Sequence, residues 1–126
     1  MISHIDHLVL TVRSLEETCA FYERVLKFTR IDTPGRPTSL HFGTCKINLH
    51  EIGHTFEPKS AAPTPGSADF CLITRESIES ILHHLQSENV AVELCPVERN
   101  GAIGPITSIY FRDPEHNLIE VSQYSV

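Results

Sequence analysis

The chain has 126 residues, of which 40% are hydrophobic and 21% are charged, and its formal net charge at pH 7 is −6. This composition predicts one folded domain over 1–126 and excludes a disordered chain. Lys and Arg are scattered along the sequence, so we expect no nucleic-acid partner. We expect no membrane partner either, because no stretch reaches the roughly 18 apolar residues of a membrane span.

The N-terminus and the cysteines favour a cytoplasmic location. The opening residues, MISHIDHLVL, lack the basic region and the small-residue cleavage site of a signal peptide. The four cysteines form no C-x-x-C pair, so we interpret them as reduced thiols that are mostly buried. They are Cys19, Cys45, Cys71 and Cys95.

The first half of the chain predicts a strand, a helix and three further strands. Residues 4–12 are apolar and β-branched, which is typical of a strand. Ser14 is followed three residues later by Glu17, a capping box that predicts a helix over 15–27. Three short strands are then expected, at 28–32, 38–43 and 45–51.

The second half predicts the same order of elements. A segment rich in proline and glycine, residues 52–66, is expected to be a linker or a surface loop. A helix is expected to begin after Ser77 and to stop at Asn89, a residue that tolerates the left-handed conformation. Glycine and proline in 96–105 predict a mobile loop. Strands are expected at 67–74, 91–95, 106–112 and 117–124.

The two halves also resemble each other in sequence, which predicts an α+β fold of two βαβββ modules, at about 4–51 and 67–124. The matching segments are DHLVLTV and ADFCLIT, TSLHFG and TSIYFR, and KINLHE and LIEVSQ. This alignment places His7 opposite Asp69, and Asn48 opposite Glu120. Four polar residues therefore occupy equivalent positions in otherwise apolar strands.

These four residues predict a site for a divalent cation. Burying a carboxylate or an imidazole is costly unless the group is paired or binds a metal. If the two halves bring these strand faces together, the set contains one imidazole, two carboxylates and one amide, which suits a divalent ion. His50 lies two residues past Asn48 on the same strand face, so it is an alternative or additional ligand. The competing interpretation is that these are ordinary polar groups on the solvent face of a sheet.

Three segments resemble the vicinal oxygen chelate superfamily: DHLVL in the first strand, the helix with Phe21 and Tyr22, and SIYFRDPEHNLIEV at 108–121. That superfamily includes glyoxalase I, fosfomycin-resistance enzymes, extradiol dioxygenases and bleomycin-binding proteins. The segment NLHEIGHTFEPKSAAPTPGSADFCLIT is similar to proteins described as glyoxalase-domain-containing or virulence-associated. The resemblance implies two modules curled into an open mixed-sheet barrel around a metal, with His7 and Glu120 among the ligands.

The chain departs from the superfamily pattern at the other two positions. Asp69 stands where the resemblance implies a histidine, and Asn48 where it implies Glu or Gln. The additional oxygen donors favour Mg²⁺ or Mn²⁺ over Zn²⁺. Ni²⁺, Zn²⁺ and Fe²⁺ stay open as the metal cofactor, and so does a site that has lost its metal.

Three functions follow from the resemblance. The first is a metal-dependent lyase, isomerase or thiol transferase of the glyoxalase type that acts on a small oxygen-chelating substrate, with Glu120 as the catalytic carboxylate. The second is a metal-free binding protein of the bleomycin-resistance type. The third is an extradiol-type dioxygenase, which needs two histidines and one carboxylate around Fe(II). In each case a homodimer is expected.

Overall fold

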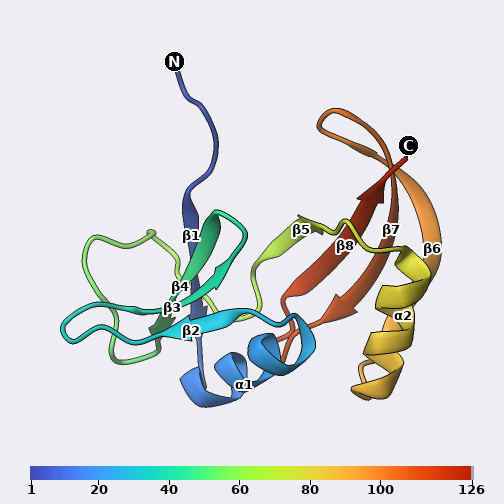
Figure 1. Cartoon of the computed structure of the whole chain (residues 1–126). Helices are drawn as coiled ribbons and strands as arrows, with labels where there is room; N and C mark the ends of the chain where they lie inside the picture. Colours follow the sequence, from blue (N-terminus) through green and yellow to red (C-terminus); the bar gives the residue numbers. More distant parts are fainter. Residues whose placement is uncertain (126) are drawn as a thin grey trace. The chain divides into compact units, whose positions relative to one another are not determined.

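The computed structural model describes residues 1–125 and, at Cys95, only the backbone. The chain divides into two compact units, Met1–Ser67 and Ala68–Val126. Each unit contains one strand, one helix and three further strands, in the βαβββ order that the duplicated sequence predicts (Figure 1).

The first unit is a four-stranded mixed sheet with one helix. The strands lie in the order β1-β4-β3-β2, with β1 parallel to β4 and the other neighbours antiparallel. Figure 1 shows α1 beside this sheet. The elements are β1 (His7–Val12), α1 (Leu15–Val25), β2 (Thr29–Ile31), β3 (Thr38–Phe42) and β4 (Cys45–Glu51).

Helix α1 begins where the capping box predicts. The Oγ atom of Ser14 accepts a hydrogen bond from the backbone N–H of Glu17 at 3.2 Å, which satisfies one free donor of the first turn. The helix is two residues shorter than expected, because Leu26 caps it and Lys27 takes a left-handed conformation with φ 61°. Its buried face belongs to the core of the unit and consists of Thr18, Cys19, Phe21, Tyr22 and Val25.

The second unit repeats this arrangement with the strand order β5-β8-β7-β6. Strand β5 is parallel to β8, and the other neighbours are antiparallel. The backbone turns at Asn89, whose φ is 58°, so the predicted left-handed stop is confirmed. The elements are β5 (Asp69–Ile73), α2 (Ile78–Ser87), β6 (Val92–Gly101), β7 (Gly104–Arg112) and β8 (Leu118–Tyr124).

The loop predicted at 96–105 is wrong, because most of it is paired strand. Strand β6 continues to Gly101, and β7 starts at Gly104, so the segment forms a long hairpin. Pro96 is accommodated where the register shifts between Leu94 and Val97, on a strand at the sheet edge. Proline is tolerated at edges and bulges because its missing N–H breaks no ladder bond there.

The registers agree with the sequence alignment of the first and last strands of the modules. His7 and Asp69 are the first residues of β1 and β5. Asn48 pairs with the residue two places beyond His7, and Glu120 pairs with the residue two places beyond Asp69. The four polar residues therefore occupy matching places in their own units.

The alignment of the third strands is wrong by two residues. Ser39 lies opposite Asn48, whereas Tyr110 lies opposite Glu120, so Ser39 corresponds to Tyr110 and not to Ser108. The turn between β7 and β8 is longer than the turn between β3 and β4, and this difference shifts the pairing. The sequence alignment matches Ser39 with Ser108 because both segments begin with Thr-Ser.

The three cysteines with described side chains are free thiols. Cys19 is buried as expected, but Cys45 is half-buried and Cys71 is exposed on the edge strand β5, so the expectation of mostly buried cysteines is wrong. The side chain of Cys95 lies outside the described part. Within residues 1–125, none of the helices has the length and apolar character needed to span a bilayer.

Candidate functional site

The predicted site residues lie on one face of each sheet. Side chains alternate along a strand, so His7 shares a face with Val9 and Thr11, and these lie opposite Lys46, Asn48 and His50 of β4. The intervening residues Leu10, Ile47 and Leu49 are buried in the apolar core of the unit. In the second unit Asp69 and Cys71 share a face with Glu120 and Ser122.

His7 is half-exposed at the start of β1. Its Nδ1 atom lies 2.8 Å from Oδ1 of Asp6, and 45% of the side chain is accessible to solvent. The hydrogen bond with His7 holds the pKa of the Asp6 carboxyl below its usual value. A carboxylate on one ring nitrogen fixes the tautomer of the imidazole, which leaves Nε2 with the lone pair that a metal requires.

Asn48 and His50 carry two buried atoms without a hydrogen-bond partner in the described part of the chain. These atoms are Oδ1 of Asn48 and Nδ1 of His50. His50 is only 4% exposed, and its ring lies 5.6 Å from that of Phe56. Buried polar atoms are nearly always hydrogen-bonded, so these two mark a place that a ligand, an ion or water completes.

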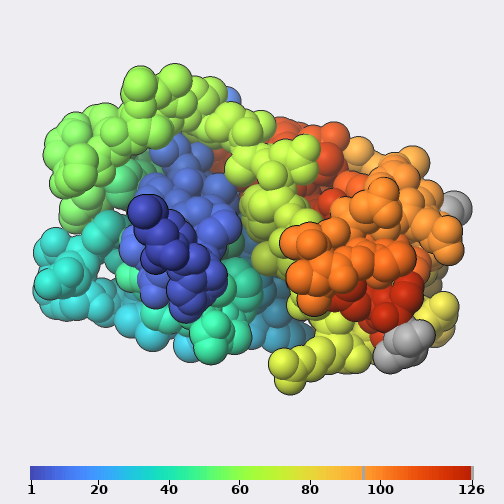
Figure 2. All heavy atoms as spheres, turned by 90° about the horizontal axis from the view of Figure 1, so that it is seen from above, coloured from blue at the N-terminus to red at the C-terminus, as the bar shows by residue number. Residues whose placement is uncertain are grey.

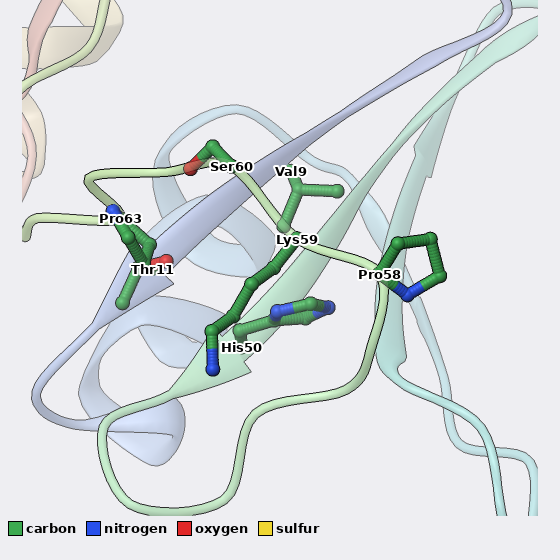
Figure 3. Close-up of a pocket in the computed structure, with 7 residues that line it drawn as sticks. All are labelled: Val9, Thr11, His50, Pro58, Lys59, Ser60 and Pro63. Carbon is green, nitrogen blue, oxygen red and sulfur yellow. The ribbon is translucent and has the colours of Figure 1, made fainter.

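His50 lines an open pocket of about 450 Å³ in the first unit. One side of the pocket is formed by Val9 and Thr11 of β1 and by His50 of β4, and the other by the proline-rich segment that follows β4 (Figure 3). Figure 2 shows that segment, in light green, on the surface of the unit. Its lining residues are Pro58, Lys59, Ser60 and Pro63.

Glu120 is held by two serines that sequence reasoning missed. Its Oε2 atom accepts hydrogen bonds from Oγ of Ser108 at 2.6 Å and Oγ of Ser122 at 3.2 Å. The two hydroxyl groups are 2.6 Å apart, and both serines are fully buried. The sequence gives only a weak signal for these two serines, because each is a polar residue within an otherwise apolar strand. The carboxylate is thereby fixed in orientation.

Glu120 also lines an open pocket of about 570 Å³ in the second unit. Arg99 supplies positive charge there, and its Nε atom donates to the hydroxyl of Tyr110 at 3.1 Å. Cys71 lies in the same pocket with its sulfur 3.2 Å from Oγ of Ser122. Desolvation raises the pKa of Cys71, and the charge of Glu120 adds to this rise, so the thiol stays neutral at pH 7 and is a poor nucleophile.

The predicted ligands are divided between the two units. His7, Asn48 and His50 lie on one sheet face of the first unit, and Asp69 and Glu120 lie on one sheet face of the second. Asp69 is exposed, whereas Glu120 is half-buried. Among the described residues, no group of three or more His, Cys, Asp and Glu side chains is gathered for a metal. The five-residue metal site thus remains a prediction.

The D-P-x-x-N part of the segment at 108–121, from Asp113 to Asn117, has a structural role. The Asp113 carboxylate accepts bonds from the backbone N–H groups of Glu115 and Asn117 and from the Asn117 side chain, each at 2.9 Å. The Asn117 side-chain oxygen accepts from the backbone N–H of Ala68 at 2.9 Å. The motif therefore holds the turn between β7 and β8 and fixes the chain where it enters β5.

Comparison with known proteins agrees with this architecture. Virulence protein STM3117 of Salmonella typhimurium is 48% identical over 124 residues, which cover 98% of this chain and 86% of that protein. Its crystal structure covers 99% of both chains with a TM-score of 0.97. An integron cassette protein of V. cholerae is 48% identical, with a TM-score of 0.96 over 99% of this chain and 98% of its own.

A further relative is glyoxalase domain-containing protein RDO1 of Mycosarcoma maydis, 47% identical over 120 residues. The match covers 95% of this chain and 68% of that protein. A family model described as Glyoxalase/Bleomycin resistance protein/Dioxygenase superfamily matches residues 4–121. With the two βαβββ units and the polar strand faces, these matches show that the chain belongs to the Glyoxalase/Bleomycin resistance protein/Dioxygenase superfamily.

Proposed function

We propose that this protein is a metal-dependent enzyme of the glyoxalase type, a lyase, isomerase or thiol transferase for a small molecule that carries two neighbouring oxygen atoms. Its superfamily includes many metal-dependent enzymes and often binds divalent metals. The observation that carries the proposal is the buried Oδ1 atom of Asn48, which has no hydrogen-bond partner among the described residues. Leaving such an atom unsatisfied costs about 1–3 kcal/mol, which a bound group would recover.

The donor set fits a divalent ion. His7 has the carboxylate partner on Nδ1 that typically accompanies a metal-binding histidine. Glu120 has the hydroxyl donors that orient a ligating carboxylate. Asn48 and Asp69 add oxygen donors, which suit Mg²⁺ and Mn²⁺. His50 is the alternative to Asn48, but Lys59 in its pocket brings a positive charge that favours Asn48 as the ligand.

The chemistry follows from these groups. A bound divalent ion would supply Lewis acidity, which stabilises negative charge that develops on substrate oxygens. Glu120 would accept a proton from the substrate and return it, because its carboxylate is half-buried and held in place by Ser108 and Ser122. The neutral thiol of Cys71 takes no part as a nucleophile.

The test is the metal content of protein purified without chelator, measured by plasma mass spectrometry. We expect a divalent metal in the wild type and its loss in Glu120→Gln and in His7→Ala. Glu93→Gln and His83→Ala are matched controls, because Glu93 pairs with Arg112 at the surface and His83 is exposed on α2. Metal-free wild-type protein that gains no thermal stability with Mn²⁺, Ni²⁺ or Zn²⁺ would contradict the proposal.

A metal-free binding protein is the second candidate function. The observation in its favour is that no group of three His, Cys, Asp and Glu side chains is gathered among the described residues, while open pockets lie on both polar sheet faces. This alternative predicts that His7→Ala binds the same small molecules as the wild type. The dioxygenase alternative needs a second histidine, and Asp69 stands at that position. Oxygen uptake with catechols would support this alternative.

A further inference from the structure

The pocket beside His50 is lined by apolar and polar side chains, and β1 and the loop after β4 each contribute both kinds. Val9 and Pro58 provide apolar surface, while Thr11 and Ser60 provide hydroxyl groups. His50 lies at the wall formed by β4, and it is 96% buried, since 4% of its surface is exposed. Its Nδ1 atom has no hydrogen-bond partner within the described residues. His50 thus combines a place at the pocket wall with a buried polar atom that lacks a partner.

Lys59 supplies the charge of this pocket. Figure 3 shows its side chain reaching from the loop toward the strand that carries His50. The ammonium group lies 2.9 Å from Oε1 of Glu57 and donates to Oγ1 of Thr55 at 3.1 Å. An ammonium group has three N–H donors, so these two contacts leave one for a ligand. Glu57 is 74% exposed, and such surface ion pairs hold the ammonium weakly.

We propose that this loop pocket binds an oxyanion, the carboxylate or phosphate group of a small molecule with an apolar body, using Lys59 and His50 as donors. His50 donates in this arrangement from the tautomer that carries its proton on Nδ1. A cation is disfavoured there by the ammonium group of Lys59. The chain as a whole carries a net charge of −6, so saturable anion binding requires a local site. In this arrangement His50 serves the anion, and Asn48 is left as the candidate metal ligand of β4.

The experiment titrates acetate and inorganic phosphate separately into ¹⁵N-labelled protein at constant ionic strength. The protein is stripped of metal on a chelating resin, because soluble chelators carry carboxylates that would compete for the pocket. The backbone amide signals of Val9, Thr11 and Ser60 report binding, since all three residues line the pocket. We expect saturable shifts, and the anion that binds tighter identifies the chemical source of the oxyanion.

Two substitutions test the donors. Lys59→Met keeps the length of the side chain without its charge, and we expect binding about tenfold weaker, as for loss of one charge-assisted hydrogen bond. His50→Phe removes Nδ1 and is expected to weaken binding similarly, whereas His50→Asn retains a donor close to that position and is expected to preserve part of it. The control is Lys27→Met, which makes the same charge change in the same unit away from the pocket.

The inference is overturned if neither anion shows saturable binding. It is also overturned if Lys59→Met binds as tightly as the wild type and the Lys27→Met control. Circular dichroism of each variant establishes that it is folded, and His50→Asn decides the role of His50 if His50→Phe does not fold. Because the protein is metal-free throughout, the result leaves the metal proposal to its own test.

Discussion

Buried polar residues of two kinds occur in this protein. Asp113 and Asn117 are buried and make hydrogen bonds with each other and with nearby backbone groups. On β4, by contrast, Oδ1 of Asn48 and Nδ1 of His50 are buried without partners in the described residues. The first pair stabilises a turn. The second pair lowers stability unless a ligand, an ion or water completes it.

Asp113→Ala tests the first kind. We expect the free energy of unfolding to fall by about 2–4 kcal/mol, because the substitution leaves buried N–H donors unsatisfied. Chemical denaturation measures it. Asp32→Ala is the matched control, since Asp32 is exposed and pairs with Arg30 at the surface, where the loss is expected to stay below about 1 kcal/mol. Equal losses in the two variants would contradict a structural role for Asp113.

At the residue scale, the sequence predicts which polar positions share a strand face, because side chains alternate with a period of two. The internal alignment of the two halves is what selects His7, Asn48 and Glu120 as candidates. It does not predict that Asp6 pairs with His7, or that Ser108 bonds Glu120 across two strands. Such contacts depend on the register of the strands and on rotamers, which no local pattern specifies.

Among the elements, helix α1 carries a buried ionisable group that links stability to pH. Cys19 is fully buried, and desolvation raises the pKa of its thiol from 9.0 to about 11. The folded protein therefore holds this proton more tightly than the unfolded chain does. Its contribution to stability is complete below pH 9 and is lost as the pH rises through about 11.

Urea denaturation at pH 8 and pH 10.5 tests this link. The wild type is expected to lose stability over that range, and Cys19→Ala to lose less, with a difference of up to about 2 kcal/mol from the raised pKa. Cys45→Ala is the control, because Cys45 is only half-buried, and it is expected to lose as much stability as the wild type. An identical loss in all three proteins would exclude Cys19 as the cause.

At the scale of elements, local composition predicts one segment wrongly. Apolar periodicity and capping residues are sufficient to predict both helices and most of the strands. Pro96 and the nearby glycines predict a loop, yet the hairpin of β6 and β7 includes them. Pairing with β7 outweighs local preference there, because Pro96 lies at a register shift on an edge strand where a missing N–H is harmless.

For the whole molecule, the architecture could be predicted because the second half of the sequence repeats the order of elements of the first half.

A βαβββ unit leaves edge strands, and an edge strand presents backbone groups that can pair with another chain. Strands β2 and β6 are edge strands and carry exposed apolar residues outside the two pockets, with Ile31 42% and Leu94 46% exposed. These features favour association of two copies of the chain, as the expected homodimer requires.

Sedimentation equilibrium measures the assembly directly. We predict a mass twice the 14.1 kDa of one chain. An aspartate at Ile31 or at Leu94 is expected to shift the mass toward the monomer, because it places a charge on an edge strand outside both pockets. Wild-type protein that sediments as a single 14.1 kDa species at every concentration would contradict the prediction.

The metal proposal assigns His7, Asn48 and Glu120 of the polar strand faces as ligands of a divalent ion. Titration of ¹⁵N-labelled protein with Mn²⁺ tests it residue by residue, because the paramagnetic ion broadens amide signals close to it. The account predicts that the signals of His7, Asn48 and Glu120 broaden first, at substoichiometric Mn²⁺. Unchanged signals at these three residues, with broadening elsewhere or not at all, would contradict it.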